Sequence, residues 1–373
     1  MNRHLHIVCL DVPYPPDYGG VFDLFYKIKY LKEEGILIQL HCFEYGRGEQ
    51  NILKQYCESV HYYKRKKGIA AFSFELPYIV SSRNNTTLKQ NLEKDKYPVL
   101  LEGIHCTSLL YRNQLQNRKV ILRAHNIEFE YYRQLAQKEK SFFKQAYYVN
   151  ETRLLREYEP KVAKKAAITL TASANDAKVH KELFGVKNAE YLPVFLPWNE
   201  VIAEPGTGDY CLYHGNLCVN ENREAALWLI EKVFSTNNIP LVIAGKNPDQ
   251  QIISAAEKYN HITVIANPTG IQMEELIKKA QINVLPSFSN TGIKLKLLHA
   301  LFCGRHCIVN NMMIEGTGLK DVCNIAESAI DFKDRTELLF KRPFIREDCN
   351  SRQQVLKRIY DNKENAKRLI RMI

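Results

Sequence analysis

The chain has 373 residues and a net charge of +11, with 45% apolar and 10% aromatic residues. This composition excludes a disordered or fibrous protein, and the length predicts two domains. No apolar run reaches the ~20 residues of a membrane span, and the first apolar run is too short for a signal peptide. The ten cysteines form no C-x-x-C pair, which indicates reduced thiols in a cytosolic protein. The positive charge favours an anionic partner.

The first part of the chain alternates apolar strand patterns with helical ones. An amphipathic helix is expected from Asp23 to a stop at Gly35. The strand patterns cover residues 5–12, 36–45, 97–105, 119–126 and 166–173. This βαβ rhythm predicts an α/β domain with a mostly parallel sheet and helices on both faces.

A stretch containing several prolines and glycines, residues 192–209, interrupts the rhythm and is interpreted as a linker. A second alternation then follows, with strand patterns over residues 210–216, 240–245, 261–267 and 282–288. We therefore expect two doubly wound domains, residues 1–195 and 196–350, with ligands bound where strands end and in the cleft between the domains. Residues 351–373 have helical spacing and predict a terminal helix, which either returns to the first domain or is a solvated basic tail.

The first strand-to-helix loop, DVPYPPDYGGVFD, places Gly19 and Gly20 at the start of a helix. Glycines there allow a phosphate or a sugar to approach the backbone closely, although a loop that needs positive φ explains them equally well. The loop lacks the G-x-G-x-x-G spacing of dinucleotide-binding folds, which argues against a dehydrogenase.

The segment VILRAHNIEFEYYRQL places Arg123, His125, Asn126 and Glu128 at the end of a strand. Four such groups can converge on a ligand, and His125 can hydrogen-bond a sugar hydroxyl or stabilise a developing charge. A structurally satisfied histidine is the alternative.

A basic run consists of Lys64, Arg65, Lys66 and Lys67 and leads into an apolar segment with two phenylalanines. This combination is typical of a protein that lies on an anionic membrane, and a solvated charged loop is the alternative. The run accompanies no known nucleic-acid-binding motif, so no nucleic-acid partner is expected.

The stretch SNTGIKLKLLHALFCGRHC, residues 289–307, places Lys294 and Lys296 in the first turn of a helix without any acidic residue. The positive end of a helix disfavours lysine, so an anion is expected there. Thr291 and Gly292 leave this N-terminus open after a strand, which predicts a diphosphate cradle. A surface helix with two solvated lysines is the alternative.

This block and the segments LVIAGKNP and INVLPSF resemble the donor half of retaining glycosyltransferases of family 4, and PYPPDYGG and RAHNIE are similar to the same family. The resemblance implies the GT-B architecture: two Rossmann-like domains that face a central cleft, with a terminal helix returning to the first domain. It also implies a nucleotide-diphosphate sugar held by the second domain, an acceptor held by the first, and no required metal or other cofactor.

Two glutamates usual in that family are replaced here by Thr291 and His299. Both can still hydrogen-bond hydroxyl groups, but neither gives a charged acceptor. The segment HGNLCVNENREA matches the usual phosphate loop without its basic pair, so Gly215, Asn216 and the nearby Lys246 are expected to serve.

These features predict a retaining glycosyltransferase that moves a sugar from a UDP- or GDP-sugar to a glycan or lipid-linked glycan at the inner face of the cytoplasmic membrane. His125 and Lys294 are the predicted catalytic residues. The predicted donor-binding residues are Gly215, Asn216, Lys246, Thr291, Gly292, Ile293, Lys296 and His299. A catalytically degenerate nucleotide-sugar-binding protein is the main alternative, and a sugar-nucleotide epimerase is a further one.

Overall fold

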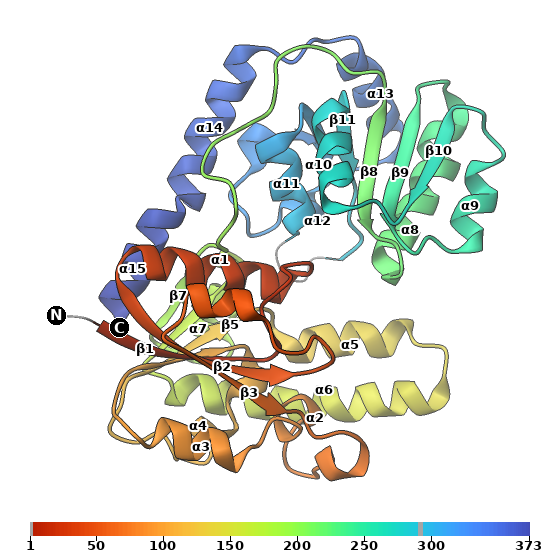
Figure 1. Cartoon of the computed structure of the whole chain (residues 1–373). Helices are drawn as coiled ribbons and strands as arrows, with labels where there is room; N and C mark the ends of the chain where they lie inside the picture. The colour runs from red at the N-terminus through yellow and green to blue at the C-terminus, as the bar shows by residue number, and fades with distance from the viewer. Residues whose placement is uncertain (1–2, 290–293) are drawn as a thin grey trace. The chain divides into compact units, whose positions relative to one another are not determined.

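The computed structural model describes residues 3–289 and 294–373, which form two compact units (Figure 1). The first unit extends to Pro197 and also includes Tyr360–Ile373, and the second lies between Trp198 and Ile359. The sequence placed the first boundary two residues earlier, between residues 195 and 196, within the predicted linker.

The first unit contains a seven-stranded parallel sheet over the described residues. Its order is β3 (Ser59–Lys64), β2 (Ile36–Glu44), β1 (Arg3–Cys9), β4 (Val99–Glu102), β5 (Val120–Ala124), β6 (Ile168–Thr171) and β7 (Ala189–Tyr191). Strand order reverses between β1 and β4, the kind of position where doubly wound sheets bind ligands.

Helices cover both faces of this sheet. They are α1 (Gly19–Glu33), α2 (Tyr78–Ser81), α3 (Thr86–Leu92), α4 (Ser108–Tyr111), α5 (Glu128–Lys138), α6 (Phe142–Lys165), α7 (Ala174–Glu182) and α15 (Asn362–Met372), with short turns η1 (Asn51–Gln55), η2 (Gly68–Ala71) and η3 (Ile104–Cys106). Leu24 and Ile28 of α1 share one apolar core with Leu369 of α15, and Leu155 and Tyr158 of α6 belong to the core on the other face. The α/β architecture predicted for this half is confirmed.

Helix α1 begins four residues before the predicted start at Asp23 and ends where the sequence indicated. Gly35 has φ +85°, and its N–H donates to the carbonyl of Lys32. Glycine adopts this left-handed conformation without steric cost, which explains why the helix stops there.

A chain of hydrogen bonds crosses the buried strands β1 to β3. His6 Nε2 lies 2.9 Å from the Asp95 carboxylate, His6 Nδ1 lies 2.9 Å from His41 Nε2, and His41 Nδ1 lies 2.8 Å from the Tyr63 hydroxyl. Burial lowers the pKa of His6 despite the hydrogen bond to Asp95, and it lowers the pKa of His41 well below its ordinary value. Both rings are therefore neutral in the folded chain near neutral pH.

We expect this chain of hydrogen bonds to make the stability of the first unit sensitive to acid. A histidine whose pKa is lowered by folding takes up its proton more readily when unfolded, so stability is complete above about pH 6.5 and is lost below it. His41→Gln removes one titrating group and should make the fall in unfolding free energy shallower, by at most ~1.4 kcal/mol per pH unit. Urea unfolding at several pH values measures this slope. His261→Gln is the matched control in the other unit, and an unchanged slope in His41→Gln would contradict the expectation.

The second unit contains a six-stranded parallel sheet over its described residues. The order is β10 (Ile262–Ala266), β9 (Leu241–Lys246), β8 (Cys211–Asn216), β11 (Ile282–Leu285), β12 (His306–Val309) and β13 (Asn324–Ile325). Strand order again reverses, here between β8 and β11. This sheet confirms the predicted second α/β domain.

The helices of the second unit connect these strands and continue toward the C-terminus. They are α8 (Asn220–Trp228), α9 (Gln250–Ala256), α10 (Gly270–Lys279), α11 (Leu295–Cys303), α12 (Asn311–Ile314), α13 (Ala329–Phe340) and α14 (Arg346–Tyr360), with η4 (Leu229–Val233), η5 (Phe234–Thr236) and η6 (Lys320–Val322).

The single terminal helix predicted for residues 351–373 is two helices, α14 and α15. Asp361 separates them with φ −68° and ψ 102°, and its side chain accepts a hydrogen bond from the N–H of Glu364. An aspartate that caps a new helix competes with continuation of the preceding one. Helix α15 packs against α1 within the first unit.

Candidate functional site

In the first unit, the carboxyl ends of neighbouring strands bring Glu102, His125 and the start of α1 together. His125 follows β5, and its Nε2 lies 2.9 Å from Oε2 of Glu102, the last residue of β4. A Cβ added to Gly20 would lie 3.3 Å from His125 Nδ1, so the ring packs directly against the first turn of α1. His125 and Gly20, predicted as site residues, are therefore neighbours.

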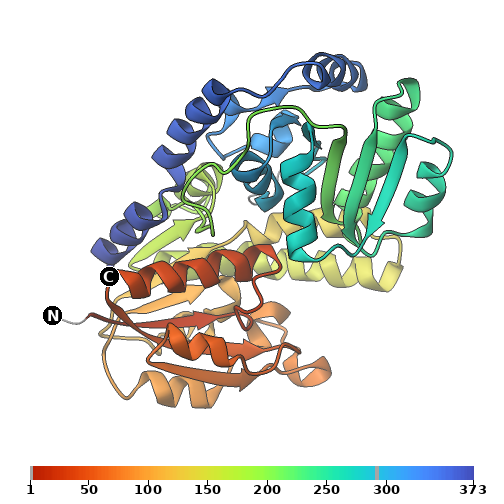
Figure 2. The same cartoon turned by 45° about the horizontal axis from the view of Figure 1, so that its top comes forward.

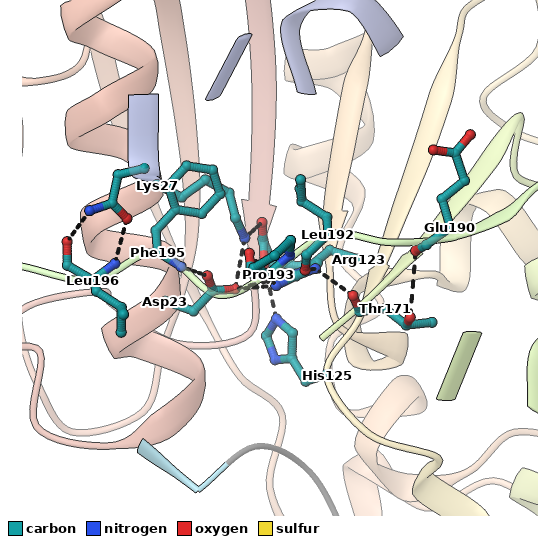
Figure 3. Close-up of polar contacts among 12 residues, drawn as sticks. Asp23, Lys27, Arg123, His125, Thr171, Glu190, Leu192, Pro193, Phe195 and Leu196 are labelled. Atoms are coloured by element: carbon teal, nitrogen blue, oxygen red, sulfur yellow. Dashed lines mark hydrogen bonds and ion pairs between the residues drawn. The ribbon is translucent and has the colours of Figure 1, made fainter. Parts of the chain in front are cut away.

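A buried network of charged side chains adjoins this histidine (Figure 3). The Lys27 ammonium donates to Glu102 at 2.7 Å and to Asp23 at 3.0 Å, and the Arg123 guanidinium lies 3.2 Å from Asp23. These four side chains are no more than 4% exposed. The negative charges of two carboxylates are therefore balanced by the positive charges of a lysine and an arginine inside the fold.

The neighbouring side chains together decide the charge of both carboxylates. Burial is the largest single effect and acts to raise the pKa of Asp23 and Glu102. The charged and hydrogen-bonding neighbours together outweigh it, with Lys27 contributing most, followed by Arg123 for Asp23 and by His125 for Glu102. Both pKa values lie below their ordinary range, so both acids are ionised near neutral pH.

The side chains of Asp23, Glu102 and His125 offer oxygen and nitrogen atoms within 4.8 Å of one another. This spacing alone would suit a metal ion. However, the Lys27 ammonium already contacts both carboxylates, and a divalent cation placed among them would be repelled by it. The residues present do not fit a metal.

Two predicted ligand contacts need correction. Arg123 is fully buried, and its guanidinium donates to Asp23 and to the carbonyl groups of Thr171 and Leu192, so it supports the site from inside the core. Glu128 is also buried at the start of α5, where burial raises its pKa to about 7.

Asn126 is half-buried and donates to the Glu128 carboxylate at 3.5 Å, which turns its amide toward that buried side chain. Gly19 is exposed at the first position of α1.

The basic run beginning at Lys64 lies at the end of β3 and in the loop that follows. Lys64, Lys66 and Lys67 are exposed. Arg65 is half-buried, stacks over the Tyr45 ring at 4.4 Å and donates to the Ser82 hydroxyl. Three of the four cations are thus available at the surface, while Arg65 also fixes the loop.

In the second unit, Lys294 lies at the N-cap of α11 and Lys296 lies in its first turn. The Lys294 ammonium lies 3.0 Å from the carboxylate of Glu221, which is in the first turn of α8, and Glu221 also accepts from the Ser287 hydroxyl. The stretch itself holds no acidic residue, but the fold places the carboxylate of Glu221 beside Lys294.

Lys296 points inward between β8 and α8. Its ammonium donates to Asn222 Oδ1 at 2.8 Å and to the Tyr213 hydroxyl at 3.2 Å, and it lies 4.8 Å from the centre of the Tyr213 ring. Burial lowers the pKa of Lys296 to about 7, although Glu221 acts in the opposite direction. This lysine is therefore poised to gain a proton when an anion binds nearby.

His299, one turn further along α11, packs against aromatic side chains. Its ring lies 4.6 Å from that of Trp198 and 6.1 Å from that of His214. Burial lowers the pKa of His299 to about 4, and its Nε2 has no hydrogen-bond partner among the described residues. A neutral imidazole with an unused nitrogen can bond a ligand hydroxyl.

The other predicted donor-binding residues lie at strand ends of the same unit. Gly215 and Asn216 close β8 next to the side chain of Asn222, and Lys246 ends β9 at the surface. Thr291, Gly292 and Ile293 lie outside the described residues.

Comparison with known proteins finds a family similar to part of the second unit. Residues 208–338, which include β8 and α11, match the family described as glycosyl transferases group 1. The matched residues form a region similar to glycosyl transferases group 1. An uncharacterized 44.6 kDa protein in the cps region of Klebsiella pneumoniae is 27% identical over 91% of this chain and 89% of its own length.

Solved structures share the fold of this chain over nearly its whole length. Sucrose-phosphate synthase from Thermosynechococcus elongatus has a TM-score of 0.68 at 13% identity and covers 99% of this chain and 98% of its own. Anabaena HepE, solved with UDP and glucose, has a TM-score of 0.67 at 8% identity, with coverage of 99% and 98%. The lipopolysaccharide outer core galactosyltransferase WaaB has a TM-score of 0.63 at 15% identity, with coverage of 98% and 99%. The predicted GT-B fold is confirmed.

Sequence reasoning missed several polar residues that shape the two clusters: Asp23, Lys27, Glu102, Glu221 and Asn222. Glu102 carried a usable signal, because an acidic residue at the end of an otherwise apolar strand faces the ligand edge of a parallel sheet. Asp23 and Lys27 carried a weaker one, since they are four residues apart on a helix face that is otherwise buried.

Proposed function

We propose that this protein is a retaining glycosyltransferase that transfers a hexose-type sugar from a UDP- or GDP-sugar to a glycan or lipid-linked glycan. The observation that carries the proposal is the pair Lys294 and Lys296 at the start of α11, beside the β8–β11 reversal of a sheet that matches glycosyl transferases group 1. A parallel sheet binds phosphate groups at helix N-termini in this position. The cps-region relative and WaaB support a polysaccharide or glycolipid acceptor.

The donor is expected to lie across the carboxyl edge of the second sheet. Its diphosphate would displace Glu221 from Lys294 and draw a proton onto Lys296, while His299 bonds a ribose hydroxyl through its unused nitrogen. Gly215, Asn216 and Lys246 lie at the same edge and complete the predicted set. These residues provide the positive charge that the departing nucleotide needs, so the reaction is proposed to require no metal.

The acceptor and the reacting bond are assigned to the first unit. His125 stands at the end of β5 against Gly20, where a hydrogen bond to a sugar hydroxyl would orient the reacting ring. The chemistry is then mainly positioning and electrostatic stabilisation of the leaving diphosphate.

One observation favours a second candidate, a nucleotide-sugar-binding protein without transferase activity. His299 stands where the resembled family carries a glutamate, and its ring is neutral and buried between aromatic groups. Incubating the protein with UDP-, GDP- and ADP-sugars and a crude bacterial glycolipid acceptor separates the two functions. Acceptor-dependent release of UDP or GDP is expected. Tight nucleotide binding without any release would instead support the binding protein.

We also propose that the first unit lies on an anionic membrane. Among the described residues no helix is long and apolar enough to cross a bilayer. Beyond the basic run, Ile69 and Phe74 are 94% and 85% exposed. Helices α5 and α6 lie side by side (Figure 2), and at their junction Phe142 and Phe143 are 76% and 84% exposed. Exposed aromatic pairs beside lysines suit the interface of an anionic bilayer.

Replacing Phe142 and Phe143 together with serine is expected to weaken binding to phosphatidylserine-containing vesicles at least tenfold, because each ring loses about 1.5–3 kcal/mol of burial in the bilayer. Vesicle sedimentation measures the change. The double variant Leu183→Ser and Ile271→Ser also removes two exposed apolar side chains and should bind like the parent. If both double variants bind the vesicles equally well, the junction of α5 and α6 does not contact the membrane. If salt does not weaken the binding of the parent protein, the basic run does not contact it.

A further inference from the structure

The two nitrogens of the His125 ring meet different surroundings. Nε2 lies 2.9 Å from the Glu102 carboxylate, and Nδ1 faces the first turn of α1 at Gly20. In a neutral imidazole one nitrogen donates a hydrogen bond and the other accepts one. Which nitrogen donates is decided by the partner that the ring already has.

Glu102 can only accept a hydrogen bond. Its other oxygen receives a hydrogen bond from Lys27, and the pKa of this carboxyl lies below the ordinary value because Lys27 and the contact with His125 together outweigh the effect of burial. An ionised carboxylate has no proton to donate. The proton between the two residues is therefore on His125 Nε2.

The carboxylate is also held in place. Lys27 is fixed by Asp23, which accepts from Arg123 and from the backbone N–H of Phe195 at 2.8 Å. Arg123 in turn donates to backbone carbonyl groups at the ends of β6 and β7. Three buried charges thus hold the Glu102 carboxylate in place, and the four side chains together carry no net charge.

We propose that Glu102 is a positioning residue that holds the Nε2 proton of His125, so that Nδ1 is presented beside Gly20 as a hydrogen-bond acceptor for a substrate hydroxyl. This inference rests on the proposed function for its catalytic consequence, but the position of the proton on the His125 ring is a property of the free protein. A missing or misdirected acceptor leaves the hydroxyl without its partner.

Gly20 supports the assignment independently. Its φ is not in the left-handed region, so the backbone does not require glycine there. An alanine Cβ would instead press on Nδ1 at 3.3 Å, whereas a Cβ at Gly19 would meet nothing within 4 Å. The space next to Nδ1 is therefore kept open by the absence of a side chain.

Three double variants test the proposal without leaving an unbalanced buried charge. Lys27→Met with Glu102→Leu removes one ion pair together with the partner of His125. Lys27→Met with Asp23→Asn removes one ion pair and keeps Glu102, so it is the matched control. Lys27→Met with Glu102→Gln instead places an amide at this position, and its oxygen can accept a hydrogen bond from the Nε2–H of His125. If the leucine variant does not fold, the parent protein still provides a test, because an Nδ1–H ring of His125 in the parent would overturn the proposal.

Long-range ¹H–¹⁵N NMR spectra of the histidine rings report which nitrogen carries the proton, and His125→Gln assigns the signals. We expect an Nε2–H ring in the parent, the control and the glutamine variant, and a shift toward Nδ1–H in the leucine variant. Relative to the control, the leucine variant should lose about 10- to 100-fold in kcat with the donor KM within about threefold.

An unchanged Nε2–H ring in the leucine variant would overturn the proposal. So would an equal loss of kcat in the control, since the effect would then belong to the charge network as a whole. A changed tautomer with full kcat would overturn the catalytic role of His125. If the parent shows no transfer, the proposed function fails, and the NMR result still decides whether Glu102 directs the ring.

Discussion

Replacing His125 with alanine is expected to lower the rate of sugar transfer about 100-fold or more while the affinity for UDP or GDP stays within about threefold. The two quantities separate because His125 lies at the carboxyl edge of the first sheet, whereas the residues assigned to the nucleotide lie in the second unit. A group that contacts only the reacting sugars changes turnover and leaves nucleotide binding largely intact.

The measurement pairs steady-state transfer with a thermal-shift titration of the free nucleotide. His61→Ala is the control, since His61 is a half-buried histidine of the same unit that lies on β3. It should retain both turnover and affinity. Parallel losses of turnover and affinity in His125→Ala would assign this histidine a structural role.

The fold was predictable because its signals are local. Each apolar run that predicted a parallel strand forms one, since such strands are buried on both faces and read as continuous hydrophobic segments. The stop of α1 at Gly35 was equally local. The terminal helix was misjudged for the opposite reason, because helical periodicity spans Asp361 while the capping side chain at that position starts a new helix.

The candidate site was predictable only where position along a strand sufficed. His125 and Lys294 follow strands, and the sequence placed them at the ligand edge. Sequence spacing could not show that Glu102 contacts a lysine 75 residues away in the chain or that Glu221 contacts Lys294 at a separation of 73. Nor could it separate Arg123, whose guanidinium is used inside the core, from the half-buried His125 and Asn126 that follow it.

The pair Lys294 and Lys296 leads to the second large prediction. Lys294→Ala should weaken binding of a nucleoside diphosphate by about 1.5–3 kcal/mol, the range for hydrogen bonds to charged groups. From the sequence alone, loss of a positive charge at a helix N-terminus would leave the melting temperature unchanged or raised. The structure reverses this expectation, since Lys294→Ala leaves the partly buried Glu221 carboxylate without its ion pair and should lower the melting temperature of the free protein.

Glu221→Gln separates the two effects. It removes the carboxylate that competes with a bound phosphate for Lys294, so it should raise nucleotide affinity a few-fold. A glutamine that can still accept from the Ser287 hydroxyl keeps the shape of the contact. If Glu221→Gln instead weakens nucleotide binding, the carboxylate is a ligand contact in its own right and the proposed competition is wrong.

Lys296→Met is expected to differ from Lys294→Ala both in its nucleotide affinity and in its stability. Because burial holds the pKa of Lys296 at about 7, a bound diphosphate should raise that pKa and take up a proton. Affinity is then greatest below about pH 7 and falls above it, by up to about tenfold per pH unit, until the pKa of the bound state is reached. The methionine variant should lose this pH dependence and keep or gain stability, since it removes a buried ammonium whose hydrogen bonds go to two neutral oxygens.

Calorimetric titrations of UDP and GDP between about pH 6 and 8.5 measure both the affinity and the protons taken up. A parent protein whose affinity does not change over this range would show that Lys296 does not face the nucleotide.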